Sequence, residues 1–164
     1  MLRKAADDHQ IRGSAEEVLK LLRSNRRKDI IDLLIVRRIV EVEGARLAAM
    51  NASKKMIARL EEIVRKQKTS ITSGSLAVEE DVRFHETLAK ASGNQFIAYS
   101  VHLLRSRHWL NYAVIAIRAK LGAGLAVDHE EIIAAVKARN PDAALMTMQR
   151  HITTLLGEVE RYWD

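Results

Sequence analysis

The sequence predicts an all-α protein, and three observations lead to that prediction. Its 164 residues include only 7 Gly and 1 Pro, so residues that interrupt helices are scarce. Ala, Leu, Ile, Glu, Lys and Arg, which favour helices, dominate the rest, and no stretch alternates as a strand would. The chain is 48% hydrophobic, which is enough to bury the core of one ordinary domain.

Capping residues and helix breakers divide the chain into seven expected helices. Ser14 and Ser53 are suited to begin helices, and so is Asn140, which precedes the single proline. Gly93 suits the left-handed position that ends a helix, and Asn94 suits the cap of the next helix. We expect helices at about 15–23, 29–51, 54–70, 76–91, 95–119, 128–139 and 141–163, and the helix at 95–119 is open to a kink.

The chain is expected to form one domain preceded by a short segment. Residues 1–28 are polar and basic, and they read as an N-terminal segment or linker that contains a short helix. Residues 29–164 carry the helical domain. Loops are expected at TSITSGS (69–75) and around Gly122 and Gly124.

The formal net charge of +6 does not by itself predict nucleic-acid binding. The densest basic stretch is KLLRSNRRK (20–28), which has no interleaved aromatic residues and reads as a solvated helix end or linker. Contact with nucleic acid is the alternative reading of this stretch. No helix-turn-helix or zinc-finger pattern accompanies it, so the charge does not predict a DNA-binding domain.

Composition also narrows the chemistry and the compartment. The chain has no Cys, so disulfides and thiolate ligands are excluded and any metal must be held by nitrogen and oxygen atoms. The start, MLRKAADDHQ, lacks the apolar stretch of a signal peptide, and no run of about 18 apolar residues predicts a membrane span. We therefore expect a cytoplasmic protein without a membrane partner.

Four residues carry most of the functional information: Asp81, His85, His129 and His151. Asp81 and His85 lie one turn apart on the apolar face of their expected helix, and His129 and His151 lie on or beside the apolar faces of theirs. A carboxylate on an apolar face is unfavourable unless it is paired. Three inward imidazoles and one inward carboxylate are the ligand set of a metal site between helices.

Each histidine also has a plainer interpretation, because a single inward histidine is more often a hydrogen-bonded core residue than a metal ligand. The combination with Asp81 favours the metal. His102 and His108 have no matching carboxylate and are expected to be surface or core residues. The aromatic residues Phe96, Trp109 and Tyr112 are expected to pack in the core.

Arg37 is a second anomaly, because it lies on the apolar line of the helix expected at 29–51. A buried guanidinium needs an anion. Glu41, one turn further along, is one possible partner. A bound carboxylate ligand, which arginine can bind through two hydrogen bonds, is the other.

Three motifs in order resemble the effector-binding C-terminal domain of the FadR subfamily of GntR transcription regulators. VRRIVEVEGARLAAMNAS (36–53) is similar to the opening helix of that domain. DVRFHETLAKASGNQFI (81–97) resembles its most characteristic stretch, and DHEEIIAAVKARNPDAALMTMQRHI (128–152) resembles its closing stretch. The match covers roughly residues 29–160.

The resemblance implies an antiparallel bundle of six to seven helices around a central metal and ligand pocket. It implies one divalent transition metal (Zn, Ni, Mn or Fe) held by Asp81, His85, His129 and His151. It further implies a small organic acid as effector, with Arg37 as its partner and Asn94 beside the pocket, although a helix cap explains Asn94 equally well. A homodimer in which the effector controls DNA binding allosterically is also implied.

One departure limits the resemblance. The winged helix-turn-helix that precedes the effector domain in this family is missing, so DNA contact is expected only through an N-terminal domain outside this chain. We therefore expect a sensor domain rather than an enzyme. The alternatives are a mononuclear metalloenzyme with an Asp/His₃ site, and a metal-free helical interaction module whose histidines are structural.

Overall fold

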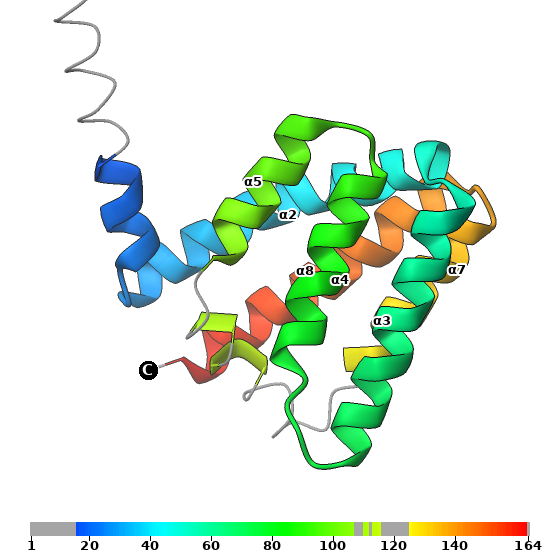
Figure 1. The fold of residues 1–164 in the computed structure, drawn as a ribbon. Helices are drawn as coiled ribbons and strands as arrows, with labels where there is room; N and C mark the ends of the chain where they lie inside the picture. The colour runs from blue at the N-terminus through cyan, green and yellow to red at the C-terminus, as the bar shows by residue number, and fades with distance from the viewer. Residues whose placement is uncertain (1–15, 107–109, 112, 116–124, 164) are drawn as a thin grey trace, which may run out of the picture.

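The computed structural model describes residues 16–106, 110, 111, 113–115 and 125–163. Every regular element among these residues is a helix, which confirms the predicted all-α class (Figure 1). A short helix spans residues 16–23. The longer helices are α2 (Arg27–Asn51), α3 (Lys54–Thr72), α4 (Val78–Ala91), α5 (Gln95–Arg105), α7 (Leu125–Lys137) and α8 (Pro141–Tyr162). No helix of this described part is long and apolar enough to cross a bilayer.

The predicted caps are present in the structure. The Ser53 hydroxyl accepts a hydrogen bond from the backbone N–H of Met56 at the start of α3. Asn140 caps α8 in the same way, with proline at the first helical position. Gly93 has a φ of 76°, as the left-handed end of α4 requires. The Asn94 side chain accepts from the first N–H groups of α5.

Two expected boundaries were wrong. The loop expected at 69–75 begins later, because α3 continues to Thr72 with threonine and serine hydroxyls bonded back to carbonyls one turn earlier. The helix expected at 95–119 is interrupted after Arg105, where Ser106 turns the chain and its hydroxyl bonds to the Leu103 carbonyl, and residues 110, 111 and 113–115 are helical again. Gly122 and Gly124 lie outside the described residues, as does Ser14.

Helix α2 is the centre of the bundle. It packs along α8 and also contacts α4, α5 and α7, while α3 packs on α4 and α7 (Figure 1). Three buried alanines, Ala45, Ala48 and Ala49, let its neighbours approach closely. An added methyl group at Gly44 would lie 3.1 Å from Ile97 of α5, so that crossing is tight too.

The apolar core has two parts with a polar layer between them. Along α8, Met148 and Ile152 belong to one part, whereas Leu155 and Val159 belong to the other. His151 is buried beside Ile152, one turn before Leu155 of the second part. Along α2 the same layer contains the buried Arg37 and Glu41. The candidate site lies in this polar layer.

Candidate metal centre

Helix α4 carries the first two candidate ligands on its buried face. Asp81 and His85 are 5% and 2% exposed, next to Phe84 and Leu88, which are also buried. The distance between Asp81 Oδ1 and His85 Nε2 is 3.8 Å. The prediction that both side chains point inward is confirmed.

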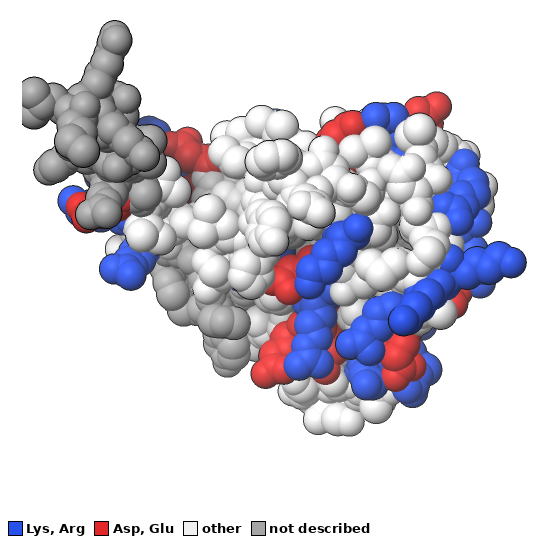
Figure 2. Space-filling model, turned by 45° about the horizontal axis from the view of Figure 1, so that its top comes forward, with Lys and Arg blue, Asp and Glu red and all other residues white. Residues whose placement is uncertain are grey.

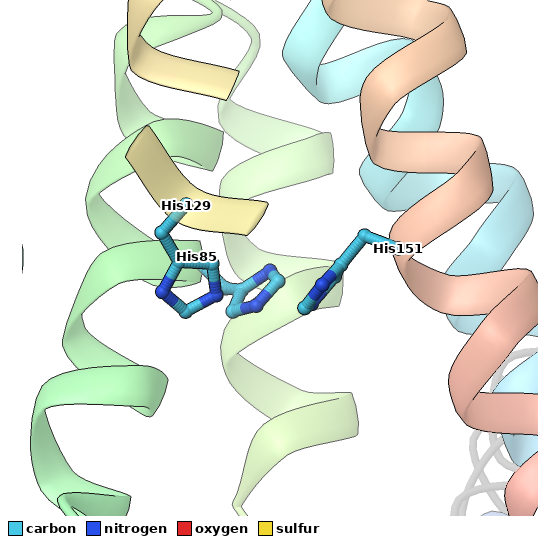
Figure 3. Close-up of side chains that lie close together, drawn as sticks. All are labelled: His85, His129 and His151. Atoms are coloured by element: carbon cyan, nitrogen blue, oxygen red, sulfur yellow. The ribbon is translucent and has the colours of Figure 1, made fainter. Parts of the chain in front are cut away.

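Helices α7 and α8 bring two further histidines to the same place (Figure 3). His129 and His151 are both buried. One nitrogen from each of His85, His129 and His151 lies within 4.8 Å of the other two. His129 Nε2 is also 3.5 Å from Asp81 Oδ1, so the carboxylate borders the same small space. All four residues singled out in the sequence therefore converge.

The opposite nitrogen of each ring faces an oxygen atom. His129 Nδ1 is 2.8 Å from the Gln67 side-chain oxygen, and His151 Nδ1 is 2.9 Å from Asp128 Oδ2. His85 Nδ1 is 2.5 Å from Glu41 Oε2, although the ring is not aligned for a straight hydrogen bond.

An Nδ1–H that faces an acceptor leaves a lone pair on Nε2, which is the tautomer that binds metals. For His85 and His129, the buried Nε2 atoms have no hydrogen-bond partner in the described part of the chain. Buried polar atoms are normally satisfied. The donor set is three imidazole nitrogens and one carboxylate oxygen, which fits a divalent transition metal.

A buried ion-pair network borders this space. Arg37 Nε donates to Glu41 Oε1 at 2.7 Å, within α2. Arg105 Nη1 donates to Asp81 Oδ2 at 2.8 Å, and its Nη2 lies 3.2 Å from Glu41 Oε2. Of the two partners predicted for Arg37, the structure contains Glu41. The Asp81 carboxylate, which has no cationic partner on its own helix, receives one from α5.

The charges of the network fix the protonation of the candidate ligands. Burial is the largest influence and opposes ionisation of Asp81, but the Arg105 guanidinium and the three neighbouring histidines together outweigh it and lower the carboxyl pKa. The pKa of the Glu41 carboxyl is also lowered, because Arg105, Arg37 and His85 together outweigh the effect of burial. Burial and the charge of Arg105 lower the pKa of His85 to about 4. Burial and the neighbouring His85 also lower the pKa of His129 well below its usual value. At neutral pH the carboxylates are charged and these two imidazoles are neutral, as metal ligands must be.

A cavity of about 10 Å³, which is room for about one water molecule, opens beside the ligands. Its polar lining comes from Arg37, Asp81, Arg105, Asn111 and His151. The Asn111 side chain donates to the Arg105 carbonyl at 2.8 Å and holds the end of α5 in place. Arg37 therefore lines the same cavity as the candidate ligands Asp81 and His151.

The other sequence-predicted residues lie elsewhere. The Asn94 side chain is used as the cap of α5, and the residue is exposed and does not line the cavity. His102 is exposed and pairs with Glu86, as expected for a surface histidine. Phe96 is 86% exposed, so the prediction that it packs in the core was wrong. His108, Trp109 and Tyr112 fall outside the described residues.

Sequence reasoning missed Arg105 and Gln67, which both touch the site. Both are fully buried. The signal for Gln67 was available, because it lies one and two turns from the buried Val64 and Leu60 on α3. The sequence indicates the burial of Arg105 less clearly, because Arg105 ends α5 whereas the helix was expected to continue to residue 119.

Comparison with known proteins agrees with this architecture. Residues 32–154 match the FCD domain family. The transcriptional regulator LutR of Bacillus subtilis is 25% identical over 149 residues, which are 85% of this chain and 66% of LutR. The transcriptional repressor NanR of Cronobacter sakazakii is 28% identical over 131 residues, which are 74% of this chain and 48% of NanR.

A solved structure gives the same result. The chain matches Streptococcus agalactiae GntR with a TM-score of 0.66 and 26% sequence identity, covering 78% of this chain and 58% of that one. The chain thus spans about half to two thirds of the length of the relatives it matches. Its relatives are transcription regulators rather than enzymes. The chain belongs to the FCD domain family, the helical effector-binding domain of GntR-type transcription regulators.

Proposed function

We propose that this chain is a metal-dependent sensor domain that binds a small carboxylate effector. Asp81, His85, His129 and His151 would hold one divalent transition metal. The observation that carries the proposal is the pair of buried Nε2 atoms, on His85 and His129, which have no hydrogen-bond partner in the described residues and lie 3.8 and 3.5 Å from Asp81 Oδ1. When bound, the metal supplies Lewis-acid positions to which a carboxylate can coordinate.

The donor set supports a transition metal rather than Ca²⁺ or Mg²⁺, which prefer oxygen ligands. Imidazole nitrogen with one carboxylate suits Zn, Ni, Mn and Fe. Three acceptors, Glu41, Gln67 and Asp128, face the Nδ1 atoms of the rings and would hold the imidazoles in their metal-binding tautomer.

Arg37 supports a carboxylate as the effector. It lines the same cavity as Asp81 and His151. Its guanidinium faces Glu41, and arginine can bind a carboxylate through two parallel hydrogen bonds. The cavity of about 10 Å³ has room for about one water molecule, so any organic acid must displace its lining. A compact hydroxy acid, keto acid or dicarboxylate requires less displacement than a ligand with a long acyl chain. We assign no effector contact to Asn94, because its side chain caps α5.

In a longer regulator, the effector would act by linking helices. An acid held between the metal ligands of α4, α7 and α8 and Arg37 of α2 would favour one arrangement of these helices over another. Such a difference shifts a conformational equilibrium in the attached DNA-binding domains. The relatives named LutR and NanR are transcription regulators, which fits this role, and a homodimer is part of the proposal.

A metalloenzyme is the weaker reading. A general base needs a pKa raised toward neutrality. Asp81 lines the cavity, and Glu41 pairs with its lining residues Arg37 and Arg105; both carboxylates have lowered pKa values. They therefore suit ligand and scaffold roles.

Calorimetry on metal-loaded protein tests the proposal. A panel of hydroxy acids, keto acids and dicarboxylates, each with its neutral amide as control, would be titrated into the wild type, Arg37→Gln and the exposed Arg83→Gln. We expect at least one acid to bind, to need the metal, and to lose at least about 10-fold in affinity with Arg37→Gln only. Binding that is unchanged without metal, or equal in both variants, would overturn the proposal.

A further inference from the structure

Asn111 is a buried polar residue that uses only part of its hydrogen-bonding capacity. It is 3% exposed and lines the cavity beside the candidate ligands. Its Nδ2 donates to the Arg105 backbone carbonyl at 2.8 Å. A carbonyl oxygen can only accept, so this contact fixes the orientation of the amide and leaves Oδ1 as an acceptor. Among the described residues, no donor reaches Asn111 Oδ1.

Arg37 has unused donors on the same cavity. It is 2% exposed, and within the described part of the chain its side chain makes one hydrogen bond, from Nε to Glu41. The terminal nitrogens Nη1 and Nη2, which form the two-pronged end of the guanidinium, have no partner there. Buried donors and acceptors are normally satisfied. The cavity therefore presents donors from Arg37 and an acceptor from Asn111 to a ligand.

We propose that Asn111 determines which acid binds, and that the effector is a 2-hydroxy acid with a short alkyl substituent. This inference rests on the proposed function and narrows it to one class of acid. The ligand carboxylate would accept from the terminal nitrogens of Arg37. The ligand hydroxyl group would donate to Asn111 Oδ1.

The size of the cavity places the two ligand groups on neighbouring carbon atoms. Arg37 and Asn111 border the same space of about 10 Å³, which is the size of one water molecule or one hydroxyl group. A hydroxyl group further along the acid would lie beyond this space when the carboxylate is held by Arg37. The hydroxyl group therefore belongs on the carbon next to the carboxylate.

A keto acid lacks the donor that Asn111 requires. Its oxygen at the same carbon is an acceptor, as Asn111 Oδ1 is, so two acceptors would face each other without a proton between them. A buried acceptor left without a partner is unfavourable enough to lower affinity about 10-fold or more. Sites that bind a ligand hydroxyl group through a buried polar partner reject analogues without that group for this reason.

The remaining wall of the cavity disfavours a second carboxylate. Its apolar residues, each at most 4% exposed, are Val114, Ile115 and Leu155. An acid that enters moves this lining apart, and its substituent then lies against these side chains. Arg105, the other cation of the lining, already donates to Asp81 and Glu41. A second carboxylate would be buried without a partner, whereas a short alkyl group would pack on the apolar wall.

Paired surface cations make a weaker site for an acid than the unused donors of Arg37. On the face shown in Figure 2, basic side chains lie beside acidic ones. The exposed Lys68 and Lys137, for example, pair with Glu130 and Glu61 between α3 and α7. Their charges are already balanced and screened by solvent.

Matched acids test the inference on the metal-loaded wild type. Calorimetric titrations would compare 2-hydroxybutyrate with 2-oxobutyrate and with malate, which adds a second carboxylate. We expect 2-hydroxybutyrate to bind at least about 10-fold more tightly than either. Equal affinities, or tighter binding of 2-oxobutyrate or malate, would overturn this inference alone. If no acid binds at all, the proposed function falls with it.

A variant separates recognition by Asn111 from its structural role. Asn111→Leu removes Oδ1 together with the hydrogen bond to Arg105, and damage to the fold would weaken both four-carbon acids equally. Loss of recognition would instead weaken 2-hydroxybutyrate alone and remove its advantage over 2-oxobutyrate. Asn51→Leu is the matched control, because the Asn51 side chain also donates to a backbone carbonyl at a helix end, that of Ser92. Asn51→Leu should keep the preference, and a preference that also persists in Asn111→Leu would refute the role of Asn111.

Discussion

Arg105 of α5 and Asp81 of α4 form a buried ion pair, with Nη1 2.8 Å from Oδ2. The pair leaves the second oxygen of Asp81, Oδ1, within 3.8 Å of His85 Nε2 and 3.5 Å of His129 Nε2. Arg105 thus orients the carboxylate and balances the negative charge of the site. The same guanidinium reaches Glu41, so one side chain links α2, α4 and α5.

Replacement of Arg105 by Met should strongly destabilise the fold, because it leaves Asp81 and Glu41 as buried charges with one cationic partner fewer. The loss of one partner of a buried pair lowers the free energy of unfolding by about 3–5 kcal/mol. Arg65→Met, which removes an exposed pair with Glu62, should change it by less than about 1 kcal/mol. Denaturant unfolding measures both, and equal effects would contradict the role of Arg105.

Gln67 should affect the metal through His129 alone. Gln67→Leu removes the oxygen that faces His129 Nδ1, so the ring loses its preferred tautomer, and metal affinity should fall about 10- to 100-fold. Gln67→Glu restores an acceptor at the same place and should recover most of that affinity. Competition with a chromophoric chelator gives the affinities. Equal losses in both variants would show that Gln67 contributes only packing.

Replacement of a histidine should lower the metal content only where that histidine is a metal ligand. His85→Ala and His129→Ala should each lower the bound metal to well below one ion per chain and remove the stabilisation that metal provides. His102→Ala should change neither, because His102 is exposed and pairs with Glu86. Elemental analysis and thermal melts measure these changes. A metal loss with His102→Ala comparable to that with His85→Ala would contradict the assignment.

The stability of metal-free protein should fall as the pH falls from about 7.5 to 5. Burial and Arg105 lower the pKa of His85 to about 4 in the folded state, against about 6.5 when unfolded. The unfolded chain therefore takes up a proton in this range and the folded chain does not, which favours unfolding. For His85 alone the loss is about 2 kcal/mol at pH 5, and His129 acts in the same direction.

Urea unfolding of chelator-treated protein at several pH values measures this slope. His85→Phe removes the titrating group and should flatten the slope by about the contribution of His85. A stability that stays constant or rises from pH 7.5 to 5 would contradict neutral, buried imidazoles.

Much of this architecture could be predicted from residues that act locally. Ser53, Asn94 and Asn140 cap helices through contacts within three residues, and helical spacing placed Asp81 and His85 on one inward face. Such effects depend on neighbours in the sequence. The family resemblance added the arrangement of these helices as an antiparallel bundle.

The remainder depends on contacts between distant residues. The ion pair of Arg105 with Asp81 joins positions 24 residues apart, and Gln67 reaches His129 across 62 residues. No local pattern encodes either contact. Phe96 was misplaced for a related reason: an aromatic residue on a helix predicts burial, but whether another helix covers it depends on contacts between distant residues.

Metal content decides whether Asp81 and the three buried histidines hold an ion. Tag-free protein, purified without chelator, would be analysed for Zn, Ni, Mn and Fe and melted before and after chelator treatment. Our expectation is about one divalent ion per chain and a clear drop in melting temperature on its removal, both lost in His129→Ala. Protein that contains no such ion, and whose melting temperature does not respond to any of the four added metals, would contradict it.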